Sequence, residues 1–472
     1  MFGRRSYLEA SVAGGVGWRR PILLNCLLGC AAALSVLVAG CGNQYRPVVS
    51  AINPVGPAGQ PAKYAVAISS PSASSPGLLT FVDFSGDTVL TTPQILSNPN
   101  YLALAPGGSQ GYVINSAGSI NEFAAGSPTS LLSSDIGQST LSVGSSPVSI
   151  TAISLAGTNA SVFVPEPALS QVAALTGTGS LEQNIGVPNN PIYVVGANSA
   201  ARAYVISEGD KVTPSTVSSV ESGNLAVSST IPVGIDPVYG VMTADGKRAF
   251  ILNKGSGTVN VINVVNNGKD LAMPVIPATG TLGQGPVWAD LSPLTNQLIV
   301  LNQGDGVHPG SLSIINIPLC STASPATNPN CDPANPVDAV GFGTVLATVP
   351  VGINPVMVSV LQDGTKAYVA NQGNAAAGVE GSVSVVNLVS GTVSATIPGI
   401  SSAAATSDTN TTPTEVYGHP TTIAATTGTP TGKVYVTSSD NKFMTVIETD
   451  TDTVTTHVNL QGLGVRVAVT AQ

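Results

Sequence analysis

Short apolar runs separated by glycine-containing turns recur along most of the chain. In the clearest copy, at 353–372 (INPVMVSVLQDGTKAYVANQ), a proline opens one apolar run and an aromatic–valine run ending in asparagine follows it. An alternating V-x-V run and a threonine/valine run come next, at 381–399. Alternation with a period of two and enrichment in β-branched residues are typical of β-strands. The unit therefore predicts four short antiparallel strands.

The repeats can be counted in two independent ways. Seven prolines open the first run of a unit: Pro99, Pro147, Pro191, Pro237, Pro286, Pro355 and Pro420. Their separations of 48, 44, 46, 49, 69 and 65 residues indicate a period in the mid-forties with two inserts, at about 317–340 and 398–418. The aromatic–valine run occurs eight times, beginning near residues 63, 111, 161, 202, 248, 297, 366 and 433.

Four antiparallel strands in a repeat of this length are the signature of a β-propeller blade. We predict an all-β fold, a single propeller of eight four-stranded blades at 63–472, with seven blades as the alternative. Glycine and proline at 56–61 spoil the inner strand of the first unit. The apolar tail Val465–Val469 is therefore expected to supply that strand and close the ring.

Composition and charge narrow the function. Hydrophobic residues make up 43% of the chain and charged residues only 9%, which suits a large β core. The net charge is −9, and without residues 1–40 (four Arg, one Glu) it becomes −12. An acidic chain without a basic cluster disfavours nucleic-acid binding.

The N-terminus has the pattern of an export signal. An apolar run at 21–40 follows Arg19 and Arg20 and ends in small residues, which predicts a signal peptide over 1–40. The segment Val38-Ala39-Gly40-Cys41 resembles the bacterial lipobox, and this resemblance implies a lipid on Cys41, a linker at 41–62 and attachment to a membrane. Gly42 favours the outer membrane. A transmembrane helix with an incidental cysteine is the alternative, and Arg4-Arg5 also resembles a twin-arginine export motif.

Two further cysteines fall within the first insert. Cys320 and Cys331 flank proline- and asparagine-rich sequence typical of a surface loop. In an oxidising compartment, two cysteines closing a short loop predict a disulfide. They have no neighbouring histidine, which makes them a poor zinc site.

The repeats are similar to the YVTN family of β-propeller repeats. The motif stands at Tyr435-Val436-Thr437 and is echoed at Tyr368–Asn371, and the resemblance covers nearly everything from 63 to 469. It implies the propeller fold. It does not identify a function, because such repeats occur in surface-layer proteins, in lactonase-like enzymes, and in haem d1 or quinone oxidoreductases.

A candidate ligand site follows from propeller topology. Loops between the second and third strands share one rim with the loops between blades, and this rim is polar in blades six to eight. The candidate rim residues are Asn302, Gln303, Asp305, His308, Asn371, Gln372, Glu380, Glu415 and His419. A merely solvated rim is the competing interpretation. The asparagines recur at strand ends, which favours a structural role for them, and His457, in an outer strand, is expected at the surface.

These observations leave three hypotheses for the function. The first is a non-catalytic binding or scaffold propeller, monomeric and anchored in the envelope, whose rim contacts an envelope protein or a small molecule. The second is a propeller enzyme of the lactonase, quinoprotein or haem d1 kind, with the central funnel as its site. The third is a structural or adhesion component. No catalytic motif, metal site or cofactor is predicted from the sequence.

Overall fold

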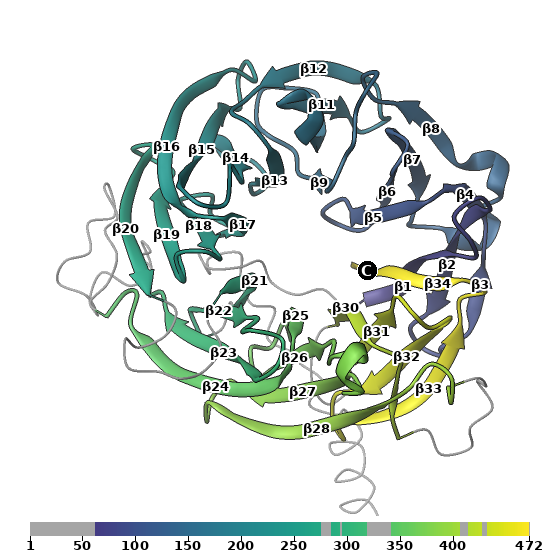
Figure 1. Cartoon of the computed structure of the whole chain (residues 1–472). Helices are drawn as coiled ribbons and strands as arrows, with labels where there is room; N and C mark the ends of the chain where they lie inside the picture. Colours follow the sequence, from purple (N-terminus) through teal and green to yellow (C-terminus); the bar gives the residue numbers. More distant parts are fainter. Residues whose placement is uncertain are drawn as a thin grey trace, which may run out of the picture. The chain divides into compact units, whose positions relative to one another are not determined.

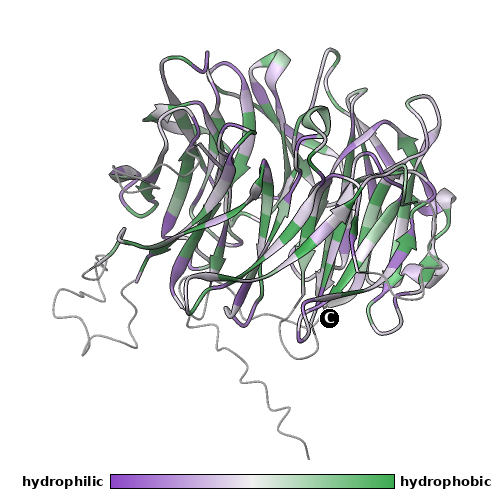
Figure 2. Cartoon of the chain, turned by 60° about the horizontal axis from the view of Figure 1, so that its bottom comes forward, coloured by the Kyte–Doolittle hydropathy of each residue, from purple (hydrophilic) through white to green (hydrophobic). Residues whose placement is uncertain are grey.

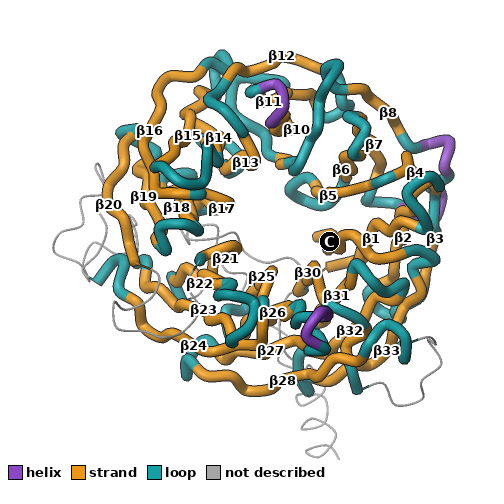
Figure 3. Tube along the Cα trace, viewed as in Figure 1, coloured by secondary structure: helices purple, strands orange, loops and turns teal. Residues whose placement is uncertain are grey.

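Eight antiparallel sheets stand around a common axis, like the blades of a propeller (Figure 1). The computed structural model describes residues 62–274, 285–292, 295–318, 341–405, 414–426 and 432–471. Within these residues the chain is almost entirely strand, with four 3₁₀ turns in the connections (Figure 3). The predicted all-β propeller of eight blades is confirmed, and the seven-bladed alternative is wrong.

In each blade the strands follow one another from the axis outward. Blade 1 contains β34 (Leu463–Ala471), β1 (Ala62–Ser70), β2 (Pro76–Asp83) and β3 (Val89–Thr91), with β4 (Gln94–Ser97) also on β2. Blade 2 contains β5 (Pro99–Leu104), β6 (Gln110–Asn115), β7 (Ser119–Ala124) and β8 (Gly137–Thr140). Blade 3 contains β9 (Thr151–Ala152), β10 (Ala160–Glu166), β11 (Gln171–Thr176) and β12 (Leu181–Gly186). Blade 4 contains β13 (Pro191–Val195), β14 (Arg202–Ser207), β15 (Pro214–Glu221) and β16 (Val227–Ile235).

The remaining blades repeat this order. Blade 5 contains β17 (Pro237–Met242), β18 (Arg248–Asn253), β19 (Thr258–Asn263) and β20 (Gly268–Pro274). Blade 6 contains β21 (Pro286–Ser292), β22 (Gln297–Asn302), β23 (Pro309–Asn316) and β24 (Val345–Ile353). Blade 7 contains β25 (Pro355–Val360), β26 (Lys366–Asn371), β27 (Ser382–Asn387), β28 (Thr392–Ile400) and β29 (Val416–Tyr417). Blade 8 contains β30 (Pro420–Ala425), β31 (Lys433–Ser438), β32 (Phe443–Glu448) and β33 (Thr453–Asn459). The 3₁₀ turns are η1 (Pro128–Ser130), η2 (Ser133–Asp135), η3 (Pro167–Leu169) and η4 (Ala375–Ala377).

The C-terminal strand closes the ring as the sequence predicts. β34 pairs antiparallel with β1, so that Val467 lies opposite Ala67 and Val469 opposite Ala65. The two ends of the described chain thus share one blade. Pro147 is an exception among the opening prolines, because β9 starts only at Thr151. Hydroxyls of Ser149 and Thr151 instead donate to carbonyls of the next inner strand.

The core lies between blades rather than within one compact interior. Each of the eight blade interfaces contains its own cluster of buried side chains. At the closing interface, for example, Ala65 and Val82 of blade 1 pack against Tyr435 and Met444 of blade 8. Figure 2 shows the apolar positions running along the blade strands. A blade on its own would expose both faces, so burial of apolar surface requires the stack of neighbours.

A polar clasp joins some neighbouring blades. In blade 7, Lys366 Nζ lies 2.8 Å from Asp452 of blade 8, and the Tyr368 hydroxyl donates to the same carboxylate. In blade 8, Lys433 Nζ lies 2.7 Å from Asp87 of blade 1. Both aspartates have positive φ, 55° and 52°, in the turn between the third and fourth strands. The repeated Lys-x-Tyr sequence at the start of β26 and of β31 therefore links each of these second strands to the next blade by polar contacts.

The second insert contributes to blade 7. Its returning segment β29 pairs in parallel with the end of β28. The ring of Tyr417 then stacks on His457 of blade 8, with centroids 3.5 Å apart. His457 is 3% exposed, and its Nε2 donates to the Glu415 carbonyl over 2.9 Å. The expectation of a surface histidine is wrong, because the insert folds back over the outer strand.

Candidate functional site

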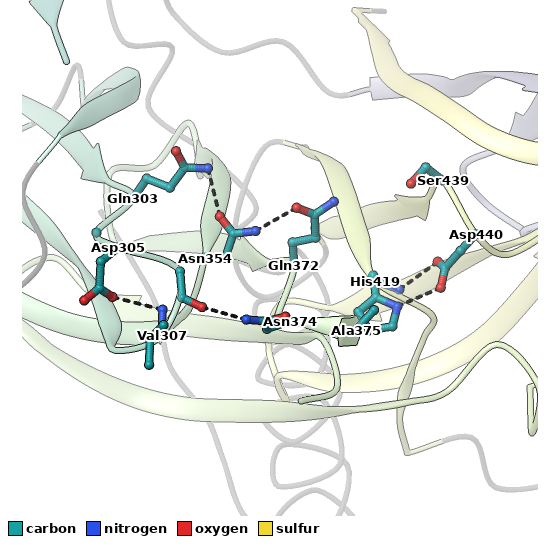
Figure 4. A pocket seen from close by; sticks show the side chains of 13 residues that line it. Gln303, Asp305, Val307, Asn354, Gln372, Asn374, Ala375, His419, Ser439 and Asp440 are labelled. Carbon is teal, nitrogen blue, oxygen red and sulfur yellow. Dashed lines mark hydrogen bonds and ion pairs between the residues drawn. The ribbon is translucent and has the colours of Figure 1, made fainter. Parts of the chain in front are cut away.

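A hollow of about 580 Å³ opens at the rim where the inner strands begin. Its wall comes from loops of blades six to eight, between second and third strands and between blades (Figure 4). It is lined by Gln303–Val307, Asn354, Gln372–Ala375, His419, Ser439 and Asp440. We refer to it as the rim pocket.

A chain of side-chain amides crosses the floor of the rim pocket. Lys254 Nζ lies 2.8 Å from Gln303 Oε1, Gln303 Nε2 lies 2.8 Å from Asn354 Oδ1, and Asn354 Nδ2 lies 2.8 Å from Gln372 Oε1. A lysine ammonium only donates hydrogen bonds, so it fixes the orientation of Gln303 and, through it, of the next two amides. The series of hydrogen bonds ends at the side-chain amide nitrogen of Gln372, which is the last donor. The positive charge of Lys254 at the other end of the series polarises it.

The backbone that places Asn354 recurs around the ring. The residue before an opening proline has positive φ in five blades: Asn98, Asn190, Asp236, Gly285 and Asn354. Its carbonyl accepts the backbone N–H of the residue that follows the second strand, as in Gln372 to Asn354 at 3.0 Å. Asparagine, aspartate and glycine tolerate this left-handed conformation better than other residues do. Four of these blades thus present two neighbouring side chains at the same level of this rim, and the fifth, with Gly285, presents one.

His419 and Asp440 form the second feature of the rim pocket. The Asp440 carboxylate accepts both the backbone N–H of His419, at 2.9 Å, and its Nδ1, at 2.7 Å. Burial alone would raise the pKa of Asp440, but these hydrogen bonds outweigh it and the pKa is lowered. With Nδ1 donating to a carboxylate, Nε2 is the nitrogen left for a ligand. The His419 side chain is only 15% exposed.

The loops on the opposite wall are shaped by turn-capping side chains. Asp305 accepts the backbone N–H groups of Val307 and His308 and lies 2.7 Å from His308 Nδ1, and these bonds lower the pKa of Asp305. Asn374 accepts from Ala377 N–H within its own loop and donates to the Gly306 carbonyl of the neighbouring blade. The charged and amide groups here hold the loops in place.

The structure brings only part of the predicted rim set together. Gln303, Asp305, Gln372 and His419 line the rim pocket. His308 stands beside it with a side chain 78% exposed, and Glu380 is exposed without lining it. Glu415 lies at the insert, where its carbonyl accepts from His457.

Asn302 and Asn371 do not reach the rim surface, which corrects the sequence prediction. Both are fully buried at the ends of their strands. Asn371 Nδ2 donates to Ser382 and Ser384 on the third strand, and its Oδ1 accepts from Gly352 N–H. Asn302 bonds serines of its own blade in the same way. These amides replace strand-end hydrogen bonds inside a blade, where no ligand can reach them.

Several predictions concern residues outside the described part of the chain. The signal peptide at 1–40, Cys41, the linker at 41–62 except its last residue, and the Cys320–Cys331 disulfide all lie there, and Ala62 already begins β1. Among the residues that are described, no cluster of three or more His, Cys, Asp or Glu side chains could hold a metal ion. None of the helical segments in the same residues has the length and apolar character to cross a bilayer.

Sequence reasoning missed a second set of polar and aromatic residues, which faces the axis. The second residue after the opening proline is aromatic in four blades: Tyr101, Tyr193, Tyr239 and Trp288. Three of these rings are in contact in sequence around the axis: Tyr239 stacks on Trp288 with ring centroids 3.9 Å apart, and Tyr193 lies tilted against Tyr239 with centroids 4.7 Å apart. Arg466 of the closing strand lies 3.8 Å over Tyr101. The recurrence of an aromatic residue two places after proline is the signal that could have found them.

Comparison with known proteins supports the fold alone. No protein-family model and no curated protein sequence matches the chain. Among solved structures, apo AztD from Citrobacter koseri is similar, with TM-score 0.56 and 11% identity over 87% of this chain and 98% of that one. The dihydro-heme d1 dehydrogenase NirN in complex with DHE is also similar, with TM-score 0.56 and 11% identity over 87% of this chain and 75% of that one. The chain therefore shares the eight-bladed β-propeller fold with these proteins.

Proposed function

We propose that this protein is an exported, lipid-anchored propeller of the YVTN-repeat type that binds a small polar molecule in the rim pocket without transforming it. The observation that carries the proposal is the preset amide chain ending at Gln372, opposite the His419–Asp440 pair. Together they offer an oriented N–H donor and an imidazole nitrogen across a hollow large enough for a sugar-sized compound. Hydroxyl and amide groups are the ligand chemistry that such a wall recognises.

The charged groups of the rim pocket support binding more than catalysis. Asp305 and Asp440 are both engaged by backbone N–H groups of the pocket's own residues. Ser439 lines the same hollow, but within the described residues no hydrogen bond joins it to His419. An activated nucleophile requires such a contact with its base.

Export and anchoring complete the proposal. The lipobox-like segment at Cys41 supports a lipid anchor, and Gly42 supports the outer membrane as its location. An oxidising compartment supports a disulfide between Cys320 and Cys331. Metabolic labelling with palmitate of the protein and of its Cys41→Ser variant tests the anchor. Label on the Cys41→Ser variant, or none on the parent, would contradict it.

Ligand binding can be tested by calorimetry with N-acetylglucosamine as the probe, since it carries both hydroxyl and amide groups. We expect measurable binding that Gln372→Ala and His419→Asn each weaken by about tenfold. His308→Asn is the matched control, because it changes an exposed histidine next to the pocket. Equal binding by the parent and by both pocket variants would reject the rim pocket as the site.

A second candidate is an enzyme of the lactonase, quinoprotein or haem d1 kind. It is favoured by one observation, the His419 ring held through Nδ1 by Asp440, because this arrangement suits a general base and equally an imidazole that ligates a metal. Proton release from glucono-1,5-lactone, together with metal analysis and the visible spectrum of the exported protein, separates the two candidates. Lactone hydrolysis lost in His419→Asn, or a stoichiometric metal, haem or quinone, would replace the binding function by the enzymatic one.

A further inference from the structure

A second hollow lies at the other end of the inner strands. Its volume is about 540 Å³, and a smaller hollow of about 240 Å³ shares Gly196, Met242, Asp290 and Leu291 with it. The rim pocket contains Asn354, which precedes β25, whereas this second hollow contains Gln362, which follows it. The two sites are therefore at opposite ends of the strands that surround the axis. We call the combined second hollow the channel cavity.

Asp290 is the one ionisable carboxylate among the residues that line the channel cavity. The other lining residues include apolar side chains of Pro106, Ile153, Met242, Val360 and Ala425. The Asp290 carboxylate accepts the backbone N–H groups of Val360 and of Leu291, each at 2.8 Å. Within the described part of the chain, no lysine, arginine or histidine forms an ion pair with it. Its charge is thus held by backbone dipoles and has no counter-ion.

A hydrogen bond from one inner strand to the next does not require a charged acceptor at the position of Asp290. In the next blade, Ser359 occupies the position equivalent to Asp290 and accepts the N–H of Ala425 at 3.0 Å. Thr422 of blade 8 likewise accepts the N–H of Val467 at 3.1 Å. Hydroxyl groups therefore suffice to join one inner strand to the next. A carboxylate at this position carries a desolvation penalty that the hydrogen bond does not require.

The wall beside Asp290 is aromatic. Tyr193 and Tyr239 line the smaller part of the cavity, and their rings lie against each other. Aromatic faces attract organic cations through the ring quadrupole. One such cation already lies beside the same row of aromatic rings, where Arg466 lies over Tyr101 and 5.4 Å from Trp288, while Asp290, two residues after Trp288, forms no ion pair with it among the described residues. A negative charge beside aromatic rings in an apolar hollow is the chemistry that recognises an amine.

We propose that the channel cavity binds a small organic cation, an amine with an apolar substituent, whose charge pairs with Asp290 and whose substituent packs between the aromatic and aliphatic walls. This site is separate from the rim pocket and does not depend on the function proposed for it. The ligand supplies the counter-ion that the protein itself does not provide.

Calorimetry at pH 7.5 on the whole exported protein tests the proposal with three probes of one shape. Benzylamine carries a positive charge, benzyl alcohol none, and benzoate a negative charge. We expect benzylamine to bind at least about tenfold more tightly than benzyl alcohol, and benzoate not to bind. Equal affinities for amine and alcohol, preference for benzoate through Arg466, or no binding of any probe would each overturn the proposal.

Two variants identify the residue responsible. Asp290→Asn keeps an oxygen that can accept the Val360 N–H but removes the charge, and it should weaken benzylamine binding by about tenfold or more. Thr422→Val removes a bond between inner strands outside the cavity, together with the contact of its hydroxyl to Thr437, so it controls for general loosening of the ring. Unchanged benzylamine affinity in Asp290→Asn, or the same loss in Thr422→Val, would refute Asp290 as the counter-ion.

Discussion

The paired charges between blades and the carboxylate of Asp290 in the channel cavity are held by different kinds of partner. At the clasp between blades 7 and 8, Lys366 and Asp452 are each less than one-fifth exposed and lie 2.8 Å apart. Tyr368 adds a further hydrogen bond to the same carboxylate, and burial raises the pKa of its hydroxyl. In the channel cavity, Asp290 is half-buried, and its carboxylate accepts only backbone N–H groups.

The presence or absence of a charged partner decides whether a buried carboxylate stabilises the ring. A buried pair that is fully hydrogen-bonded has already replaced its lost hydration, so removing one partner is destabilising. A buried charge without a partner is itself a source of instability, and burial accordingly raises the pKa of Asp290 to about 6. Substitutions in the two regions should therefore change stability in opposite directions.

The most severe test removes the strand that closes the ring. Deleting residues 463–472 takes away β34, leaving β1 without its inner neighbour and the channel without Arg466. We expect the melting temperature to fall by about 10 °C or more, or the cooperative transition to disappear. Deleting Gln472 alone is the control, because it lies beyond the strand. An unchanged melting temperature in the ten-residue deletion would refute closure by this strand.

Breaking one clasp should have the next largest effect. In Asp452→Ala, the Lys366 ammonium and the Tyr368 hydroxyl both lose their partner, which should cost about 3 kcal/mol of unfolding free energy. Denaturant titration measures this cost. Asp450→Ala changes an exposed aspartate in the same turn and should have almost no effect. Similar losses in both variants would show that the turn, and not the clasp, is responsible.

The fold could be predicted because its determinants repeat. The eight aromatic–valine runs coincide with the second strands of eight blades, and the tail Val465–Val469 falls within the closing strand β34. The strand pattern of a blade can be recognised from many copies of the repeat. One irregular copy, such as the one with the short β9, therefore does not obscure it. The burial of His457 could not be foreseen, because it depends on where an irregular insert returns.

The sites were predicted less well, for a physical reason. Gln303 and His419 were found because loop order alone assigns them to one rim. Asn302 was misplaced because the same loop position can point its side chain outward or back into the blade. Asp290 was overlooked because only the three-dimensional structure shows that a single carboxylate in an apolar strand lacks a counter-ion. A unique feature has no repetition to reveal it.

Neutralising Asp290 should change stability in the opposite direction to the clasp variant. Asp290→Asn should raise the unfolding free energy at pH 7.5 by about 1–2 kcal/mol, because the native state no longer holds an unpaired charge. The native carboxyl binds its proton more tightly than the unfolded one, so the parent protein gains stability as the pH falls from about 6 toward 4. The advantage of the variant should shrink over this interval. A destabilised variant at pH 7.5 would mean that the bond to Val360 matters more than the charge.

The smallest effect concerns His457, which responds to acid with the opposite sign. Burial lowers the pKa of His457, so protons bind the unfolded chain more readily and stability is lost as the pH falls below about 6.5. The structural reason is that Nε2 already donates to the Glu415 carbonyl, while Nδ1 is buried without a partner among the described residues. A protonated ring would need a second acceptor there.

His457→Phe keeps an aromatic ring against Tyr417 and should remove a loss of about 0.5–1 kcal/mol between pH 7.5 and 5.5. Because protonation of Asp290 adds stability over part of the same interval, it should offset part of this loss in the parent protein, and Asp290→Asn should lose more stability than the parent between pH 7.5 and 5.5. If Asp290→Asn and the parent lose stability equally on acidification, the carboxylate in the channel has a counter-ion after all, and the contrast between the two regions fails.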